Sequence, residues 1–342
     1  MEPYTLGLFA NMYPAFDGDL NGIFIWRMVK KLESQGIVVK KAVKQSVSVL
    51  GYVPFYIDSA FLCGDHSLDI LQAHYIPHSS IIPSIAKGNR PLVLKFHGDD
   101  ARIFPYQNSL NRRIIQAQLR RADYVLTASE EMRRGLISLG GDENRITALS
   151  SGVDTREYAP ADRDLSRKTL GLPVDGTLIC LYVGRIHPWK GINEMIAAAR
   201  NFPEMLFIFI GPGMIPVHPE NCRFIGNIRH EDIKTWINAA DISLLPSYTE
   251  GISNFIMESL SCEVPVIASD AGGNPELVMD HETGLLVPAK DSIVLSDAIA
   301  WMSVHESERR LMGKQGRNEM VSRYHDDLLI SKLMEIHKTL LK

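Results

Sequence analysis

The sequence predicts an α/β protein built from two doubly wound, Rossmann-like domains. Short apolar segments alternate with segments of helical periodicity along nearly the whole chain, which is the pattern of βαβ units and parallel sheets. The alternation is interrupted between residues 151 and 175 by a stretch with many charges, glycine and proline, as expected of a linker. A chain of 342 residues also exceeds what one hydrophobic core usually organises.

The first half of the chain contains short apolar segments that fit strands and amphipathic segments that fit helices. The candidate strands are residues 4–10, 70–74, 92–96, 124–128 and 146–149. The candidate helices are residues 23–34, 108–121 and 130–139. Residues 40–65 show no dominant periodicity, and the sequence assigns them no element.

The same alternation restarts beyond the linker. The candidate strands are residues 178–183, 206–210, 242–245, 264–268 and 285–287. The candidate helices are residues 193–200, 232–239, 254–261, 293–302 and 307–324. Residues 326–341 form a last amphipathic segment, which predicts a terminal helix.

The composition excludes several classes of protein. The hydrophobic fraction of 45% and the charged fraction of 22% are those of a globular chain and not of a disordered one. A net charge of −4 argues against a nucleic-acid partner. The four cysteines form no CxxC pair, so we expect neither a disulfide framework nor a zinc knuckle, and a reduced cytoplasmic location fits best.

The sequence also bears on membranes. The N-terminus lacks a basic segment followed by an apolar one, so we expect no signal peptide. Apolar runs such as residues 205–210 are far too short to span a bilayer. Any membrane contact is therefore expected to be peripheral, on the inner face of the cell membrane. Basic pairs such as Arg112 and Arg113 could meet anionic lipids there, although they are more often solvated helix faces.

The most informative stretch runs from Glu250 to Val287 and begins just after a predicted strand. Ser253 is a suitable N-cap, and Asn254 then opens a helix that carries Glu258. The backbone N–H groups at such a helix start favour bound anions such as phosphates. Glu250 and Glu258 could accept hydrogen bonds from sugar and ribose hydroxyls. A single glutamate in such a place is more often a solvated carboxylate that stabilises the helix dipole.

A second candidate is the loop from Gly184 to Gly191, directly after the predicted strand 178–183. It carries Arg185 and Lys190, and positioned cations of this kind can offset the charge on a diphosphate leaving group. The loop is no P-loop, because it lacks the GKS or GKT ending. Taken alone, it would equally fit a surface loop with solvated cations.

Two weaker candidates follow strands of the first half. His97 comes directly after the strand 92–96 and beside a glycine, where it could meet a ligand, although a lone histidine is more often structural. Gly22 precedes the predicted helix 23–34, and a glycine there permits close backbone approach to an anion or a sugar.

No metal site is expected. The segments Asp17–Asp19 and Asp162–Asp164 both read DxD, a pattern that can bind a metal–nucleotide complex. The first lies in a predicted turn and the second in the linker, and neither position suits a donor-bound metal.

Together these motifs resemble the signature of the GT4-type retaining glycosyltransferases of the GT-B fold. The run from Glu250 to Val287 contains EG, a second glutamate after seven intervening residues, PVIA, GG, E and TGLLV in the order of that family. The GRxxxxKG loop, the HGxD element at residues 97–100 and the N-terminal YP…NG loop are similar in order and spacing. The resemblance covers nearly the whole chain, and the Glu250–Glu258 signature is its most specific part.

The resemblance implies a domain organisation and an activity. Residues 1–155 would form the acceptor-side domain, completed by a helix of residues 325–342 that crosses back to it, and residues 156–324 would bind the nucleotide sugar. A hexose would pass from a nucleoside-diphosphate donor, a UDP-sugar in the first place with a GDP-sugar as the open alternative, to a glycan, lipid-linked or small-molecule acceptor of the cell-envelope polysaccharide kind. Retention would need no metal, no other cofactor and no dedicated nucleophile, so the lack of a glycosidase-like carboxylate pair is no contradiction.

The resemblance also implies roles for particular residues. Arg185 and Lys190 match the diphosphate-binding pair, Glu258 matches the ribose carboxylate, and Glu250 matches the carboxylate at the donor sugar. The catalytic set would be His97, Glu250, Arg185 and Lys190. The donor-binding set would be Gly22, Gly184, Arg185, Lys190, Glu250, Gly251, Ile252, Ser253, Asn254 and Glu258.

The chain departs from the family pattern at Ser151, where asparagine is common, at Ser253, where proline is also frequent, and in its short N-terminal half. The short N-terminal half bears on acceptor contacts more than on donor contacts. Two other functions fit the same residues: a nucleotide-sugar epimerase of the same architecture, and a nucleotide-sugar-binding protein without turnover. The sequence carries no signal for the oligomeric state, and the sugar depends on variable loops such as residues 211–219.

Overall fold

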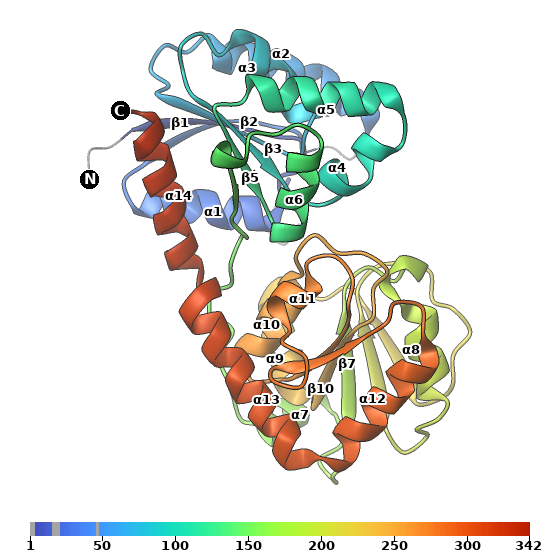
Figure 1. Cartoon of the computed structure of the whole chain (residues 1–342). Coiled ribbons are helices and arrows are strands. Elements are labelled where there is room, and N and C mark those ends of the chain that lie inside the picture. The colour runs from blue at the N-terminus through green and yellow to red at the C-terminus, as the bar shows by residue number, and fades with distance from the viewer. Residues whose placement is uncertain (1–3, 16–20, 46–47) are drawn as a thin grey trace. The chain divides into compact units, whose positions relative to one another are not determined.

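The computed structural model describes residues 4–15, 21–45 and 48–342, and the chain divides into two compact units. The first unit contains the described residues up to Ser151 together with Asp327–Lys342, and the second contains Gly152–Asp326. Within the described residues each unit has a parallel sheet of six strands with helices packed on it, so the predicted α/β fold class is confirmed (Figure 1).

The sheet of the first unit has the order β2-β1-β3-β4-β5-β6. The order reverses between β1 and β3, which are neighbours in the sheet, and this position is the switch point of the unit. The strands are β1 (Thr5–Ala10), β2 (Val38–Val43), β3 (Ile70–His74), β4 (Leu92–Phe96), β5 (Tyr124–Thr127) and β6 (Ile146–Ala148). The helices are α1 (Ile23–Ser34), α2 (Tyr52–Cys63), α3 (Ile81–Ala86), α4 (Asp99–Arg102), α5 (Ser109–Arg121) and α6 (Glu130–Ser138).

The last helix of the chain, α14 (Asp326–Leu340), completes the first unit. Its apolar side chains Leu329, Ile330, Leu333 and Met334 are buried in one core with residues of β1, α1 and β3. The Nζ atom of Lys31 in α1 lies 2.6 Å from a carboxylate oxygen of Asp327. The helix therefore returns to the N-terminal unit, as the family resemblance implies (red in Figure 1).

The second sheet has the order β12-β11-β10-β7-β8-β9, with its switch point between β7 and β10. The strands are β7 (Ile179–Val183), β8 (Leu206–Ile210), β9 (Cys222–Gly226), β10 (Ile242–Leu245), β11 (Val266–Ser269) and β12 (Gly284–Val287). The helices are α7 (Arg163–Leu170), α8 (Ile192–Ala199), α9 (Ile233–Ala239), α10 (Asn254–Ser261), α11 (Asn274–Leu277), α12 (Ser292–Val304) and α13 (Glu306–Glu319).

Most predicted elements occur with small changes at their ends, but the short helices α3, α4 and α11 and two further regions were not predicted. Residues 40–65, which were left unassigned, supply most of β2 and the helix α2. The strand β9 was missed because it is an edge strand whose outer positions, Arg223 and Ile225, face solvent. Such a strand lacks the continuous apolar run that marks the buried strands.

The linker is anchored to the second unit by a buried ion pair. The guanidinium of Arg167 in α7 lies 2.5 Å from the carboxylate of Asp241, and both side chains are 2% exposed. Asp241 also accepts a hydrogen bond from the backbone N–H of Ile179 at 2.8 Å, and it pairs with Arg163 at 2.6 Å. This carboxylate therefore joins α7 to the starts of β7 and β10.

We expect Arg167→Met to destabilise the protein by about 3–5 kcal/mol, because the carboxylate of Asp241 stays buried and loses its main partner. Urea unfolding followed by circular dichroism measures the change. Lys168→Met at the neighbouring, exposed position is the matched control and should change stability little. Equal unfolding midpoints for the two variants would show that the ion pair contributes nothing.

Candidate active site

The predicted site residues of the second unit lie at the carboxyl ends of the two strands that flank its switch point. Gly184 and Arg185 directly follow β7, and Glu250 follows β10. Because β7 and β10 are parallel neighbours, their carboxyl ends share one edge of the sheet. This edge is where open α/β sheets bind their ligands.

The loop after β7 is held by its backbone. The N–H of Gly184 donates to the carbonyl of Ile210 at 2.8 Å, and the N–H of Ile186 donates to the carbonyl of Pro212 at 2.7 Å. The hydroxyl of Tyr182 donates to the carbonyl of Arg185 at 2.8 Å. The main chain is thus fixed against the loop after β8, and the side chain of Arg185 remains exposed.

Lys190 and Glu250 form an ion pair that connects the loops after β7 and β10. The Nζ atom of Lys190 lies 2.5 Å from Oε1 of Glu250, and the two side chains are 32% and 11% exposed. Gly191 has a φ of +73°, and a Cβ there would lie 2.3 Å from the carbonyl oxygen of Pro246, so only glycine fits. The N–H of Tyr248 donates to the carbonyl of Trp189 at 2.8 Å. The structure therefore brings these two predicted residues together.

The helix α10 begins beside Glu250. Ser253 caps it, because its hydroxyl accepts a hydrogen bond from the N–H of Ile256 at 3.3 Å, as predicted. Gly251, Ile252 and Asn254 are half-buried around this start. Glu258 lies within α10 and is 6% exposed, and its charge adds to burial in raising the pKa of the Cys262 thiol to about 12.

In the first unit, His97 follows β4 and has a set of close neighbours. Its Nε2 lies 2.9 Å from Nδ1 of His74, the last residue of β3, and its ring packs against Phe24 and Tyr75. The carboxylate of Asp100 accepts hydrogen bonds from the backbone N–H groups of His97, Gly98 and Ile76.

Asp100 is the acidic residue of the HGxD pattern, and its backbone contacts fix the loop that carries His97. Burial raises the pKa of Asp100 to about 6, although the three backbone N–H groups oppose this shift. Sequence reasoning did not select His74 as a site residue. The signal was two polar residues, Gln72 and His74, at alternating positions of a strand with a continuously buried pattern.

Gly22 precedes α1 and has a φ of +73°, and a Cβ there would lie 2.5 Å from the carbonyl oxygen of Met12. The backbone conformation and the close approach of Met12 therefore explain why glycine is needed here, and contact of Gly22 with a donor stays a prediction.

The two DxD segments have different outcomes. Asp17–Asp19 lie outside the described residues. Asp162 caps α7, because its carboxylate accepts the N–H of Leu165 at 2.7 Å. That metal ions play no part stays a prediction.

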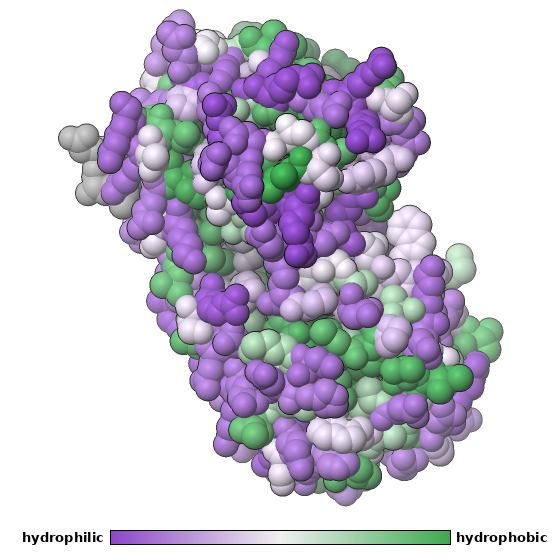
Figure 2. Space-filling model, in the orientation of Figure 1, coloured by the Kyte–Doolittle hydropathy of each residue, from purple (hydrophilic) through white to green (hydrophobic). Residues whose placement is uncertain are grey.

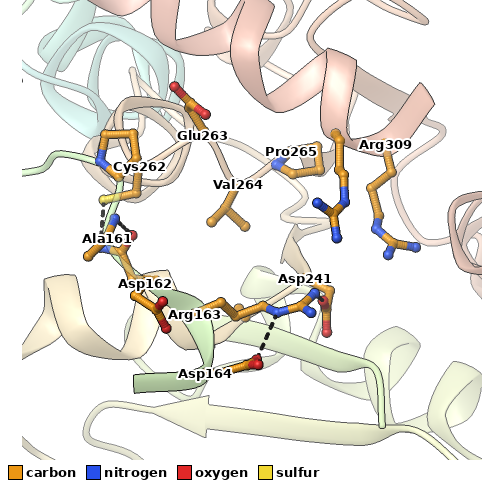
Figure 3. A pocket seen from close by; sticks show the side chains of 14 residues that line it. Ala161, Asp162, Arg163, Asp164, Asp241, Cys262, Glu263, Val264, Pro265 and Arg309 are labelled. Carbon is orange, nitrogen blue, oxygen red and sulfur yellow. Dashed lines mark hydrogen bonds and ion pairs between the residues drawn. The ribbon is translucent and has the colours of Figure 1, made fainter. Parts of the chain in front are cut away.

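A cavity of about 370 Å³ lies at the opposite edge of the second sheet, near the amino ends of β10 and β11 (Figure 3). Arg163 reaches toward Asp241 and Asp164 across it. Arginines and carboxylates both line the wall, so the cavity favours no anion. It is separate from the edge that carries Lys190 and Glu250.

Hydrophilic side chains are interspersed with apolar ones over the face shown in Figure 2. In the described part of the chain, no helix combines the length and apolar character needed to cross a bilayer. Peripheral membrane contact stays a prediction.

Two parallel sheets, each with candidate groups at its strand ends, define the class of α/β proteins with two Rossmann-like units. Residues 162–319 match the family model of Glycosyl transferases group 1, and residues 27–157 match that of Glycosyltransferase Family 4. Together these segments cover most of the chain, which therefore belongs to the GT4-type glycosyltransferases of the GT-B fold.

Curated relatives are similar over part of their length. The chain is 28% identical to the putative teichuronic acid biosynthesis glycosyltransferase TuaC of Bacillus subtilis, over 68% of this chain and 60% of that protein. It is 33% identical to the D-inositol 3-phosphate glycosyltransferase of Mycobacterium tuberculosis, over 52% of this chain and 40% of that protein. The chain thus spans about half the length of the curated relatives that it matches.

Solved structures share the fold over nearly the full length. Sucrose-phosphate synthase from Thermosynechococcus elongatus has a TM-score of 0.86 at 20% identity, with 98% of this chain and 99% of that one covered. Anabaena HepE in complex with UDP-glucose has a TM-score of 0.79 at 20% identity, with 98% and 99% covered.

Lys95 in β4 lies near the candidate histidines and supplies a test of their surroundings. It is buried, its Nζ donates to the carbonyl of Leu149, and burial lowers its pKa to about 7. The unfolded chain therefore binds this proton more tightly than the folded one, and a rise from pH 7 toward 10 favours folding.

We expect the free energy of unfolding of the wild type, minus that of Lys95→Met, to increase over this range by at most about 1.4 kcal/mol per pH unit. Chemical unfolding of both proteins at each pH measures it. If this difference in the free energy of unfolding stays constant from pH 7 to 10, the lowered pKa of Lys95 is contradicted.

Proposed function

We propose that this chain is a retaining, metal-independent glycosyltransferase that moves a hexose from a nucleoside-diphosphate donor, UDP in the first instance. The observation that carries the proposal is the Lys190–Glu250 ion pair at the switch point of the second unit. It combines a cation suited to a diphosphate with a carboxylate suited to sugar hydroxyls, beside the start of α10.

The donor diphosphate would bind to Lys190, to the exposed side chain of Arg185 and to the start of α10. In the structure the carboxylate of Glu250 is paired with the ammonium group of Lys190. A diphosphate that takes over this ammonium leaves the carboxylate of Glu250 to the sugar. Glu258, buried within α10, would hold the ribose.

In the transfer step the bond between the anomeric carbon and the diphosphate oxygen breaks, and its electron pair leaves with the diphosphate. The acceptor hydroxyl attacks from the same face, and its proton passes to the departing phosphate oxygen, so the configuration is retained. Arg185 and Lys190 offset the growing negative charge, which is the work a metal ion does in other transferases. His97 of the first unit would lie beside the transferred sugar.

The relatives support a choice of substrates. HepE of Anabaena, which shares the fold, is described in complex with UDP and with UDP-glucose, which favours a UDP-sugar donor. The names of the curated relatives concern teichuronic acid biosynthesis and D-inositol 3-phosphate. Both favour a hydroxyl acceptor on a glycan, a lipid-linked glycan or a small phosphorylated polyol.

The test is a thermal-shift screen of UDP, GDP and ADP and their sugar conjugates, followed by an assay of nucleoside-diphosphate release in excess EDTA with candidate acceptors. A ligand that binds the folded state raises its melting temperature, so the correct nucleotide stands out. Binding without acceptor-dependent release, with or without Mg²⁺ or Mn²⁺, would indicate a binding protein. Release that EDTA abolishes and Mg²⁺ restores would contradict metal independence.

We expect Lys190→Ala and Arg185→Ala each to lower kcat/KM by about 2–4 kcal/mol of transition-state stabilisation, because charge grows on the leaving diphosphate. Steady-state kinetics at saturating acceptor measure the loss. Lys314→Ala on the exposed face of α13 is the control cation and should retain full activity. Near wild-type turnover in both loop variants would mean that the loop does not contact the diphosphate.

The two glutamates should fail differently. Glu258→Ala should mainly raise the donor KM, because ribose contacts are made equally in the ground and transition states. Glu250→Ala should mainly lower kcat, since the sugar ring gains positive charge as the diphosphate departs. Because Glu250 contacts Lys190, the double variant Lys190→Ala/Glu250→Ala should lose less kcat/KM, as a free energy, than the sum of the losses of the two single variants. Weaker binding of UDP to Glu250→Ala, with binding unchanged in Glu258→Ala, would reverse the assignment.

A further inference from the structure

A continuous chain of hydrogen bonds crosses the first unit and ends on His97. The hydroxyl of Tyr4 lies 2.7 Å from Nδ1 of His337, and Nε2 of His337 lies 2.8 Å from Oε1 of Gln72. The amide nitrogen of Gln72 lies 2.7 Å from Nε2 of His74, and Nδ1 of His74 lies 2.9 Å from Nε2 of His97. The chain connects the last helix of the protein to the candidate site.

The links of this chain are removed from water. Gln72 and His337 are fully buried, and His74 is 1% exposed. Gln72 and His74 alternate along β3 and therefore point to the same side of the sheet. A buried polar group left without a partner is costly, so each member of the chain depends on the next.

The atoms of Gln72 give the chain a direction. Its carbonyl oxygen can only accept, so Nε2 of His337 carries a proton and Nδ1 of His337 accepts from the hydroxyl of Tyr4. Its amide nitrogen can only donate, so Nε2 of His74 accepts. The amide nitrogen also lies 3.8 Å from Sδ of Met28, a weak acceptor, which fits this orientation of the amide and not the reversed one.

The direction carries through to His97. Since Nε2 of His74 accepts, the proton of its neutral ring resides on Nδ1 and is donated to Nε2 of His97. Burial lowers the pKa of both His74 and His97 well below the usual value, and the charge of Lys95 adds to the effect. Burial also lowers the pKa of His337 to about 3. All three rings are therefore neutral at pH 7.

We propose that Tyr4, His337, Gln72 and His74 are positioning residues that hold His97 as its Nδ1–H tautomer. His97 then offers the donor sugar a hydrogen-bond donor and not a base, because its Nε2 lone pair is already used. This role rests on the proposed function, in which His97 lies beside the sugar. It agrees with a transfer in which the acceptor proton leaves on the phosphate, so that no protein base is needed.

The first test reads the tautomers directly. The full chain, labelled with ¹⁵N in its histidine rings, is studied by long-range ¹H–¹⁵N correlation at pH 7.5, with signals assigned through single histidine variants. We expect Nδ1–H tautomers for His74 and His97 and the Nε2–H tautomer for His337. An Nε2–H tautomer at His97 overturns the proposal, whatever the enzymatic activity.

The second test reverses the direction of the hydrogen-bond chain without changing the shape of the side chain at position 72. In Gln72→Glu both oxygens accept, so His74 should move its proton to Nε2 and His97 should become the Nε2–H tautomer. We expect this variant to lose about tenfold or more in kcat/KM and to bind UDP normally, because Gln72 lies in the other unit from the diphosphate residues. Lys338→Gln, which changes the exposed neighbour of His337, is the control and should keep both tautomer and rate.

If Gln72→Glu does not fold, Tyr4→Phe removes only the hydroxyl that begins the chain. Part of the His97 population should then change to the Nε2–H form, with a proportional loss of rate. A switched tautomer at His97 with unchanged kcat/KM would overturn the proposal and leave the glycosyltransferase function standing. If the wild type shows the expected tautomers but transfers no sugar, the proposed function is contradicted, while the hydrogen-bond chain and its direction still stand.

Discussion

Every described strand of both sheets is parallel to its neighbours, and this constraint determines where chemistry can occur in the protein. Parallel pairing places all carboxyl ends of a sheet at one edge, and the reversal of strand order opens that edge between β1 and β3 and between β7 and β10. His74 ends β3 in the first unit, whereas Arg185, Lys190 and Glu250 follow β7 and β10 in the second. Within each unit the placement of these residues is thus a result of chain topology, before any particular side-chain contact is made.

The polar side chains at the two switch points are held by different interactions. At the second, Lys190 and Glu250 form an ion pair that stays partly solvated, since each side chain is more than a tenth exposed. At the first, His74 is buried and His97 is half-buried, both rings are uncharged, and their arrangement comes from directional hydrogen bonds. One site is therefore arranged by charge and the other by proton position.

Much of the fold and part of the site could be predicted from the sequence, because the buried strands are continuous apolar runs and the glycosyltransferase signature is local. The strand β9 and the helix α2 could not, since an edge strand and a helix with exposed apolar residues such as Phe61 lack a clear period. The pairing of Lys190 with Glu250 could not be predicted either, because it depends on β7 and β10 being neighbours in the sheet. The contact between Gln72 and His337 joins residues far apart in the chain, and no local pattern indicates it.

The return of α14 to the first unit sets an order on synthesis. The ribosome makes residues 327–342 after the whole second unit. The second unit can therefore fold while the core of the first unit still lacks the side chains of α14. Leu329, Leu333 and His337 arrive together in one helix and close that core and the hydrogen-bond chain in the same event. In a nascent chain, the hydrogen bonds of Tyr4 and Gln72 to His337 therefore cannot form until α14 has been made.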